Sequence, residues 1–357
     1  MLHLSSPTAL CRRHLRWLIT VVTLFAMLLL GGCSRPPEIH KLAGAAEGTT
    51  YHISWWSQRE VDPEALEKNI DQALQQVDLW ISNYRDDSLI ERFDRGSSTQ
   101  WQTLPSDVVQ LLSIAHTVHR ESRGCYDPTI APLFDLWGFR ADHFQPPSQS
   151  SIEATLAKVG FDHLQLDPAQ DRVRKTLPGL SVDMSSMGEG YTLWRLRQVL
   201  ENAGIQAYLI EFGGDMLARG RKPDGSTWKV AIERPSPDRM AVERVLAITG
   251  KSGVSINTSG TYHHFFDAAG HRYSHILDPR TGAPVTHDLV SASVIGSDPR
   301  LGDAWATAML CLGQQAGMAV ARAQHLAVLF IQEDGDGKLH ESRSPALDGS
   351  DLVKALP

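Results

Sequence analysis

Apolar and polar side chains alternate over residues 51–56, which places Tyr51, Ile53 and Trp55 on one face. Strict alternation of this kind predicts a strand with one buried side. Further segments rich in β-branched and aromatic residues are also predicted to be strands. They span residues 207–212, 228–233, 245–249, 289–295 and 328–331.

Other segments repeat their apolar side chains every three or four positions, which predicts helices that pack against a core. The first of these helices begins at Asp62-Pro63, a favourable cap followed by a proline. A shorter helix is expected to start at the Ser150-x-x-Glu153 capping box and to end at Gly160. The periodic segments span residues 62–81, 106–121, 301–312 and 314–324.

The most distinctive polar cluster lies in residues 181–191. We predict a strand over residues 177–182 and a turn bracketed by Gly188 and Gly190, followed by a helix over residues 191–203. The start of such a helix directs N–H groups at an anion, and the carboxylates and hydroxyls of the turn are ligands that a hard cation prefers. An ordinary capped turn between a strand and a helix is the alternative.

Helices and strands do not alternate strictly along the chain, as a doubly wound parallel sheet would require. We therefore expect an α+β fold, with mixed sheets covered by packed helices. The sequence contains no repeated period and no convincing linker. About 325 residues remain after the N-terminal segment described next, which suits one large domain or two closely packed lobes.

The N-terminus has the pattern of an export signal. Arg12, Arg13 and Arg16 form a basic start, and residues 17–30 are apolar but too few to span a bilayer comfortably. The tetrapeptide Leu-Gly-Gly-Cys that ends at Cys33 resembles a bacterial lipobox.

We therefore expect residues 1–32 to be a lipoprotein signal peptide and Cys33 to carry the lipid. Residues 33–42 would form a tether, and residues 43–357 the functional domain. An uncleaved anchor or a signal peptide without lipid is the alternative. In each case the domain would lie outside the cytoplasm, and the lipid would hold it in the periplasm at the inner or the outer membrane.

Composition narrows the classes of function. A net charge of −7 and an isoelectric point near 6.1 give no basic surface for nucleic acid. Cys125 and Cys311 could pair in an oxidising compartment or remain free. A P-loop is excluded because Val245 stands where its first glycine is required, and a Rossmann fingerprint is excluded because Leu193 replaces its third glycine.

Several short motifs follow one another in a specific order along nearly the whole mature chain. They are Gly48-Thr49-Thr50-Tyr51, Ser82-Asn83-Tyr84-Arg85, Tyr126-Asp127-Pro128-Thr129, Leu136-Trp137-Gly138-Phe139, residues 182–191, Phe212-Gly213-Gly214-Asp215, Thr258-Ser259-Gly260, residues 274–279 and Asp303-Ala304-Trp305-Ala306-Thr307. In this order they resemble the ApbE family of FAD:protein FMN transferases, which are periplasmic lipoproteins. The resemblance implies a single catalytic domain with a T-fold-like α+β architecture.

The resemblance also implies a reaction. FAD would be cleaved at its pyrophosphate with the help of Mg²⁺, FMN would pass to a Thr or Ser hydroxyl of a target protein, and AMP would be released. The targets would be exported or membrane-bound redox-complex subunits with an acceptor motif of the type Asp-Gly-x-Thr/Ser-Gly-Ala-Thr. Hydrolysis of FAD to FMN and AMP is an alternative, and storage of flavin by a non-enzymatic lipoprotein is another.

By the same resemblance, Mg²⁺ would be held by Ser186, Asp303 and Thr307. Asp303 and Thr307 are four positions apart on a predicted helix and therefore share a face. Some relatives carry an additional carboxylate at the position of Ala306. Water or phosphate oxygens would then complete the coordination shell here.

Flavin and nucleotide contacts carry over to a larger set of residues. Two positions depart from the pattern frequent in the family, because Glu47 stands in place of methionine and Glu189 in place of lysine. A carboxylate beside a pyrophosphate needs a cation or a ribose hydroxyl as a partner. The expected contacts are Tyr84, Cys125, Tyr126, Asp127, Asp183, Glu189 and Ile276.

His275 is the expected proton acceptor for the incoming hydroxyl, since imidazole titrates near neutral pH. Asp278 would orient it or would contact the nucleotide. A structural histidine that bonds to a backbone carbonyl is the alternative.

Overall fold

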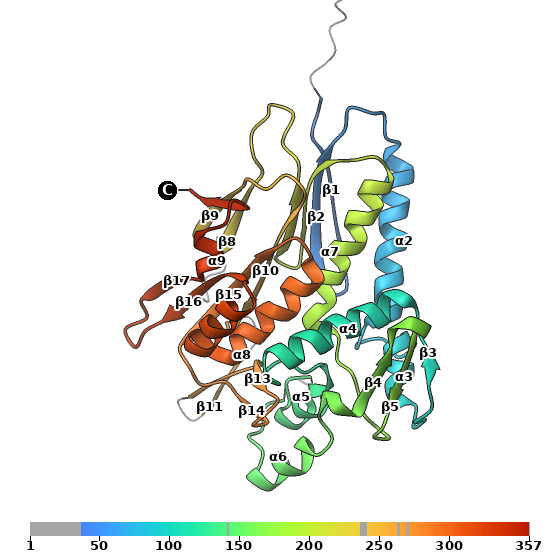
Figure 1. Cartoon of the computed structure of the whole chain (residues 1–357), viewed down its shortest axis with the longest axis vertical. Coiled ribbons are helices and arrows are strands. Elements are labelled where there is room, and N and C mark those ends of the chain that lie inside the picture. The colour runs from blue at the N-terminus through green and yellow to red at the C-terminus, as the bar shows by residue number, and fades with distance from the viewer. Residues whose placement is uncertain (1–36, 141–142, 236–240, 263–264, 269–270, 357) are drawn as a thin grey trace, which may run out of the picture. The chain divides into compact units, whose positions relative to one another are not determined.

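An antiparallel sheet of eight strands forms the centre of the fold (Figure 1). The computed structural model describes residues 37–140, 143–235, 241–262, 265–268 and 271–356. All pairings within this sheet are antiparallel. From edge to edge the strands are β1 (His40–Ala46), β2 (Thr49–Trp56), β6 (Ala207–Phe212), β7 (Asp215–Arg219), β10 (Val254–Gly260), β15 (Leu289–Gly296), β16 (Ala327–Glu333) and β17 (Leu339–Arg343).

Two long helices cover one face of this sheet. Helix α7 (Ser185–Asn202) packs on β6 and β7, and α8 (Pro299–Ala323) packs on β10 and β15. Helices α2 (Pro63–Ile81) and α4 (Ser106–Glu121) lie against α7 and α8 and form the next layer (Figure 1). Buried side chains of the sheet and of all four helices form two large apolar clusters between these layers.

The opposite face of the sheet is covered by a third apolar cluster. A three-stranded sheet and one short helix close it: β18 (Val353–Ala355), β9 (Val242–Ile248), β8 (Lys229–Glu233) and α9 (Pro345–Asp348). Residues 39–357 form one compact unit. The expected α+β fold is therefore confirmed.

Shorter elements surround the ends of α4, α7 and α8 (Figure 1). They include a second three-stranded sheet, two hairpins and three helices. These elements are α3 (Leu89–Arg95), α5 (Ala131–Trp137), α6 (Gln149–Leu156), β3 (Gln102–Thr103), β4 (Leu164–Asp167), β5 (Arg172–Lys175), β11 (Phe265–Ala268), β12 (His271–Ser274), β13 (Leu277–Asp278) and β14 (Ala283–Pro284).

Where the periodicity is strong, the structure follows it. The side chain of Asp62 accepts hydrogen bonds from the N–H groups of Glu64 and Ala65, as predicted for the cap of α2. Ile70 and Val77 on its inner face are completely buried, and such burial stabilises the fold by roughly 1.5–3 kcal/mol per side chain. The two late helices are also confirmed as two segments of α8, which meet at Gly313 (φ 73°, ψ 172°).

The central segment differs from its prediction. Residues 177–182 are not a strand, and α7 begins at Ser185, so that Gly188 and Gly190 lie inside a helix instead of a turn. Each glycine weakens a helix by about 1 kcal/mol relative to alanine, and the tertiary contact of α7 with α8 explains why Gly190 is kept there. A Cβ at Gly190 would lie 2.3 Å from the carbonyl oxygen of Pro299 and 2.8 Å from the Cβ of Asp303.

Two smaller predictions also need correction. Ser148, not Ser150, caps α6, because its hydroxyl accepts the N–H of Ser151, and the helix ends at Leu156. Residues 40–42, expected in the tether, belong to β1 and pair with β2. The edge of the main sheet therefore begins closer to the N-terminus than the composition suggested.

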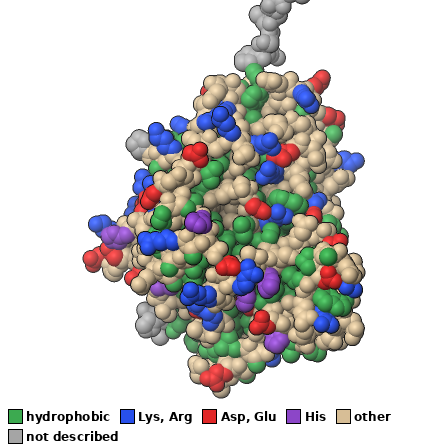
Figure 2. Space-filling model, in the orientation of Figure 1, with side chains coloured by type: hydrophobic (Ala, Val, Ile, Leu, Met, Phe, Trp, Pro, Cys, Tyr) green, Lys and Arg blue, Asp and Glu red, His purple; other side chains and the backbone are tan. Residues whose placement is uncertain are grey.

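The signal pattern and Cys33 lie outside the described residues. Within the described part of the chain, no helix combines the length and the apolar character needed to cross a bilayer. On the face seen in Figure 2, lysine and arginine side chains are interspersed with acidic ones.

Candidate functional site

A cavity of about 380 Å³ lies where α5, α7, α8, β10 and β13 meet. Apolar side chains, among them Ile130, Phe134 and Leu277, line part of its wall, and hydroxyls and carboxyls line the rest. Asp278, expected to orient His275 or to contact the nucleotide, does not line this cavity, but the structure brings the other expected site residues within the described chain to it. They are Tyr84, Cys125, Tyr126, Asp127, Asp183, Ser186, Glu189, His275, Ile276, Asp303 and Thr307.

The three expected metal ligands come from two helices in contact. Asp303 and Thr307 lie one turn apart on α8, and Ser186 lies in the first turn of α7. The Asp303 carboxylate accepts the N–H of Gly190 at 2.8 Å. The absence of a side chain at Gly190 therefore sets the distance between the two helices and brings the carboxylate to the start of α7.

Each hydroxyl of this set has a partner that fixes it at the cavity wall. The Ser186 hydroxyl lies 3.1 Å from the hydroxyl of Tyr126, and the Thr307 hydroxyl lies 3.3 Å from that of Ser259. Burial raises the pKa of Tyr126 far above its usual value, so its hydroxyl stays neutral. Oxygen donors of this type suit a hard divalent cation.

Acidic side chains around these donors repel one another. Burial, followed by the charge of Asp215, raises the pKa of Asp303 well above its usual value. Burial also raises the pKa of Glu189, with further contributions from Asp215 and Asp303. A cation among these groups would reverse this effect because it favours their charged forms. The residues present therefore fit a divalent metal ion.

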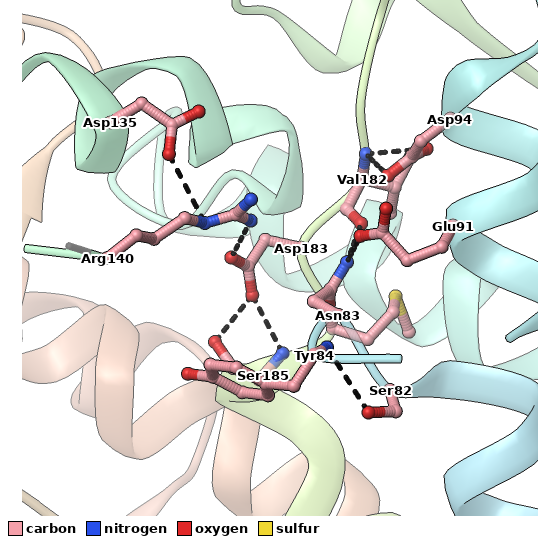
Figure 3. A network of polar contacts seen from close by, with 11 residues as sticks. Ser82, Asn83, Tyr84, Glu91, Asp94, Asp135, Arg140, Val182, Asp183 and Ser185 are labelled. Carbon is pink, nitrogen blue, oxygen red and sulfur yellow. Dashed lines mark hydrogen bonds and ion pairs between the residues drawn. The ribbon is translucent and has the colours of Figure 1, made fainter. Parts of the chain in front are cut away.

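The segment before α7 has no secondary structure of its own, and side chains from elsewhere hold its backbone (Figure 3). The Asn83 amide donates to the carbonyl of Val182 at 2.9 Å and accepts the N–H of Met184 at 2.7 Å. The Asp94 carboxylate accepts the N–H of Val182 at 3.0 Å. Asn83 therefore fixes the chain on both sides of Asp183, while Tyr84 beside it lines the cavity.

Asp183 connects this segment to the loop after α5 (Figure 3). One of its oxygens accepts the N–H and the hydroxyl of Ser185, and the other accepts a hydrogen bond from Arg140 at 2.7 Å. Arg140 also lies 3.7 Å from Asp135. Sequence reasoning missed Arg140, and the only available signal was its place directly after the motif that ends at Phe139.

A second cavity of about 680 Å³ shares Tyr84, Ser185 and Glu189 with the first. Tyr84 is 86% exposed at this shared boundary. Glu47 lines the second cavity and accepts a hydrogen bond from the hydroxyl of Thr192. The two cavities thus adjoin each other and share this aromatic side chain.

Cys125 and Cys311, whose pairing the sequence left open, form a disulfide. The carboxylate of Asp278 lies within 4.8 Å of both sulfur atoms. This group is not a metal site of the thiolate type, because both sulfurs are used in the bond. Asp278 also accepts two hydrogen bonds from the guanidinium of Arg280, at 2.9 and 2.7 Å.

Comparisons with known proteins found a matching family model and similar sequences. The sequence model described as the ApbE family matches residues 48–330. The FAD:protein FMN transferase of Vibrio cholerae is 34% identical over 320 residues, which cover 89% of this chain and 94% of that protein. The protein of the same name from Escherichia coli K12 is 34% identical over 328 residues, which cover 88% of this chain and 93% of that protein.

Solved structures show the same fold. The flavin transferase ApbE from Vibrio cholerae superposes with a TM-score of 0.79 at 32% identity, over 88% of this chain and 99% of that chain. The apo form of the Pseudomonas stutzeri flavinyl transferase ApbE also gives a TM-score of 0.79 at 32% identity, over 87% of this chain and 96% of that chain.

Proposed function

Because this chain belongs to the ApbE family and has the fold of solved ApbE flavin transferases, we propose that it is a Mg²⁺-dependent FAD:protein FMN transferase. The observation that carries the proposal is the convergence of eleven expected site residues on one cavity, with carboxyl and hydroxyl oxygens beside the start of α7. The chain is accordingly an enzyme rather than a store of flavin.

The geometry suits a dinucleotide. The two adjoining cavities offer one space for each of its ring systems, and Tyr84 at their boundary can stack on one of them. The first turn of α7 lines both cavities through Ser185. The positive end of the α7 dipole therefore favours the diphosphate between the rings.

Mg²⁺ bound by Ser186, Asp303 and Thr307 would neutralise charge on the diphosphate. His275 takes the proton from the hydroxyl of the acceptor Thr or Ser, and this oxygen forms a bond to the phosphorus of the FMN half. The bond between that phosphorus and the bridging oxygen breaks, and AMP leaves with the electron pair. The cavity walls supply positioning, which is the main contribution of a protein to phosphoryl transfer.

We further propose that the domain lies in the periplasm, attached to a bacterial membrane by lipid on Cys33. The basic and apolar pattern of the N-terminus supports this location. The disulfide between Cys125 and Cys311 is a second, independent support, because disulfides persist in oxidising compartments. The acceptors would then be exported or membrane-bound redox subunits.

The test is an assay with purified protein, FAD, Mg²⁺ and a fragment that carries an Asp-Gly-x-Thr-Gly-Ala-Thr motif. We expect the fragment to gain the mass of esterified FMN and AMP to appear in equal amount. A fragment with alanine in place of the modified threonine serves as the control. AMP without a labelled fragment would instead indicate FAD hydrolysis, and bound FAD without either product would indicate storage.

The metal assignment is tested with Asp303→Ala, which we expect to lower the transfer rate at least about 100-fold because a ligand charge at the diphosphate is lost. Asp298→Asn is the matched control, since Asp298 caps the same helix and pairs with Arg300 away from the cavity. A normal rate for Asp303→Ala would refute the assignment.

A further inference from the structure

The disulfide joins two walls of the cavity that are far apart in sequence. Cys125 lines the cavity directly before Tyr126 and Asp127. Cys311 lies on α8, one turn after Thr307 and two turns after Asp303, and does not line the cavity. We call residues 125–127 the nucleotide wall. A covalent bond across 186 positions of sequence therefore connects this wall to α8, the helix that carries the expected metal ligands Asp303 and Thr307.

The hydrogen bonds of Tyr126 and Asp127 lead to elements other than α8. The N–H of Tyr126 donates to the hydroxyl of Ser122 at 3.1 Å, and its carbonyl lies 2.8 Å from a ring nitrogen of His119, so both bonds return to the end of α4. The Asp127 carboxylate accepts the N–H groups of Thr129 and Phe161. The Tyr126 hydroxyl reaches Ser186 on α7. These bonds orient the wall but do not connect it to α8.

The α8 wall is anchored on its other side. Gly302 lies against the side chain of Asn257, and Thr307 is bonded to Ser259, so β10 holds the helix from the sheet side. Directly after Cys311 the helix is broken at Gly313. The disulfide is thus attached to the last turn of the straight segment that carries Asp303 and Thr307.

We propose that Cys125 and Cys311 are positioning residues, whose disulfide holds the nucleotide wall at the correct distance from the metal ligands before FAD binds. This inference rests on the proposed function, because it assumes that FAD and Mg²⁺ occupy the cavity. With the bond intact, the site is preorganised and binding does not have to order its two walls. With the bond reduced, the walls must be brought together by the ligand, which weakens binding.

The bond can be reduced by a phosphine. Tris(2-carboxyethyl)phosphine attacks one sulfur and the S–S bond breaks; water then gives its oxygen to phosphorus, while its two protons go to the sulfur atoms. The products are two thiols and a phosphine oxide. No chemistry of the proposed transfer depends on either sulfur. Because Cys125 lines the cavity and Cys311 does not, an effect on FAD binding that Cys311→Ala shares reports on the walls and not on a lost contact of Cys125.

The experiment measures the dissociation constant of FAD by flavin fluorescence, in the presence of Mg²⁺, for full-length protein before and after reduction. We expect reduction to weaken binding about tenfold, as loss of preorganisation does. Cys311→Ala should weaken binding equally, although its side chain lies outside the cavity. The double variant Cys125→Ala/Cys311→Ala should bind like reduced protein and should not respond to the phosphine.

Kinetics separate positioning from mere stabilisation of the fold. In the transfer assay, reduction should raise KM for FAD about tenfold and change kcat by less than about threefold.

A lower melting temperature with unchanged binding and unchanged KM would overturn the proposal, and so would an effect of Cys125→Ala that Cys311→Ala does not share. Unfolding of both reduced protein and the double variant at the assay temperature would also overturn it, since the bond would then hold the fold and not the cavity. Because FAD binding is measured without an acceptor, it can confirm or refute this inference even if transfer itself fails.

Discussion

At the scale of single residues, the cavity depends on side chains whose partners are fixed by the fold. Asn83 forms hydrogen bonds with the backbone of Val182 and Met184, which lie outside any strand. Asp183 accepts hydrogen bonds from Ser185 at the start of α7 with one oxygen and from Arg140 with the other. An unsatisfied buried backbone group costs about 1–3 kcal/mol. Residues that do not touch a ligand therefore determine where those that do are placed.

His275 is the residue for which we predict a purely chemical role. His275→Asn should lower the transfer rate at saturating FAD at least about 100-fold, because the acceptor hydroxyl loses its proton acceptor. FAD binding should change little. His287→Asn, outside the main cavity, is the control. A normal transfer rate for His275→Asn would leave His275 with a structural role only.

Because Asp94 is buried, we predict that the free energy of unfolding depends on pH. Burial raises its pKa to about 8 in the folded protein, whereas an unfolded aspartate titrates near 4. Between these values the folded state binds more protons than the unfolded state, so the stability contributed by this group is present at low pH and is lost as pH rises toward 8.

The slope from this single group is at most about 1.4 kcal/mol per pH unit. Asp94→Asn should remove it while keeping an oxygen for the N–H of Val182. Urea unfolding at pH 5 and pH 8 measures the difference. If wild type and variant lose stability in parallel over this range, Asp94 is already ionised in the folded protein.

At the scale of elements, the contact between α7 and α8 is decisive for the site. It brings Ser186 and Glu189 from one helix beside Asp303 and Thr307 from the other. Gly190 is a position of close approach between the two helices, since its N–H bonds to Asp303 and a Cβ there would lie 2.3 Å from the carbonyl oxygen of Pro299. A change in this contact affects stability and the metal ligands together.

Gly190→Ala should therefore destabilise the fold by about 1–3 kcal/mol, as overpacking does, and should lower transfer more than tenfold. Gly188→Ala is the control for stability alone, because Gly188 lines the second cavity, which the proposed function gives to one ring system of FAD. A Cβ there would meet no atom within 4 Å, and alanine should stabilise the helix by up to about 1 kcal/mol. Urea midpoints and transfer rates measure both effects. Equal stability of the two variants would contradict the role given to Gly190.

At the scale of the whole molecule, the relevant features are the disulfide of the compact unit and the N-terminal segment that precedes this unit. Residues 39–357 form one compact unit, and the disulfide ties its middle to α8. Loss of such a bond typically costs about 2–5 kcal/mol of stability. The sequence before this unit contains the proposed signal peptide, residues 1–32, and Cys33, the proposed site of the lipid.

Cys33→Ser tests the anchor. Without lipid, the protein should move from the membrane fraction to the soluble periplasmic fraction, because one thioether-linked lipid group supplies the membrane affinity. Fractionation followed by immunoblotting measures the distribution. Ser34→Ala should leave the protein in the membrane fraction. An unchanged membrane association of Cys33→Ser would indicate an uncleaved anchor.

The sequence by itself determined the elements with strong periodicity and the set of residues at the site. The strand at Tyr51, Ile53 and Trp55 and the helix capped by Asp62 follow from local patterns, since burial of a face requires a fixed spacing. The family resemblance carried by the ordered motifs selected eleven of the residues that line the cavity, but it did not name the apolar wall formed by Ile130, Phe134 and Leu277.

Only the tertiary structure decided features that depend on distant contacts. Gly188 and Gly190 looked like turn residues, yet the approach of α8 places them in a helix. The bond between Cys125 and Cys311 and the pairing of Arg140 with Asp183 also join segments far apart in sequence. Local propensity cannot report such contacts, because their free energy arises only when the packed elements bring the partners together.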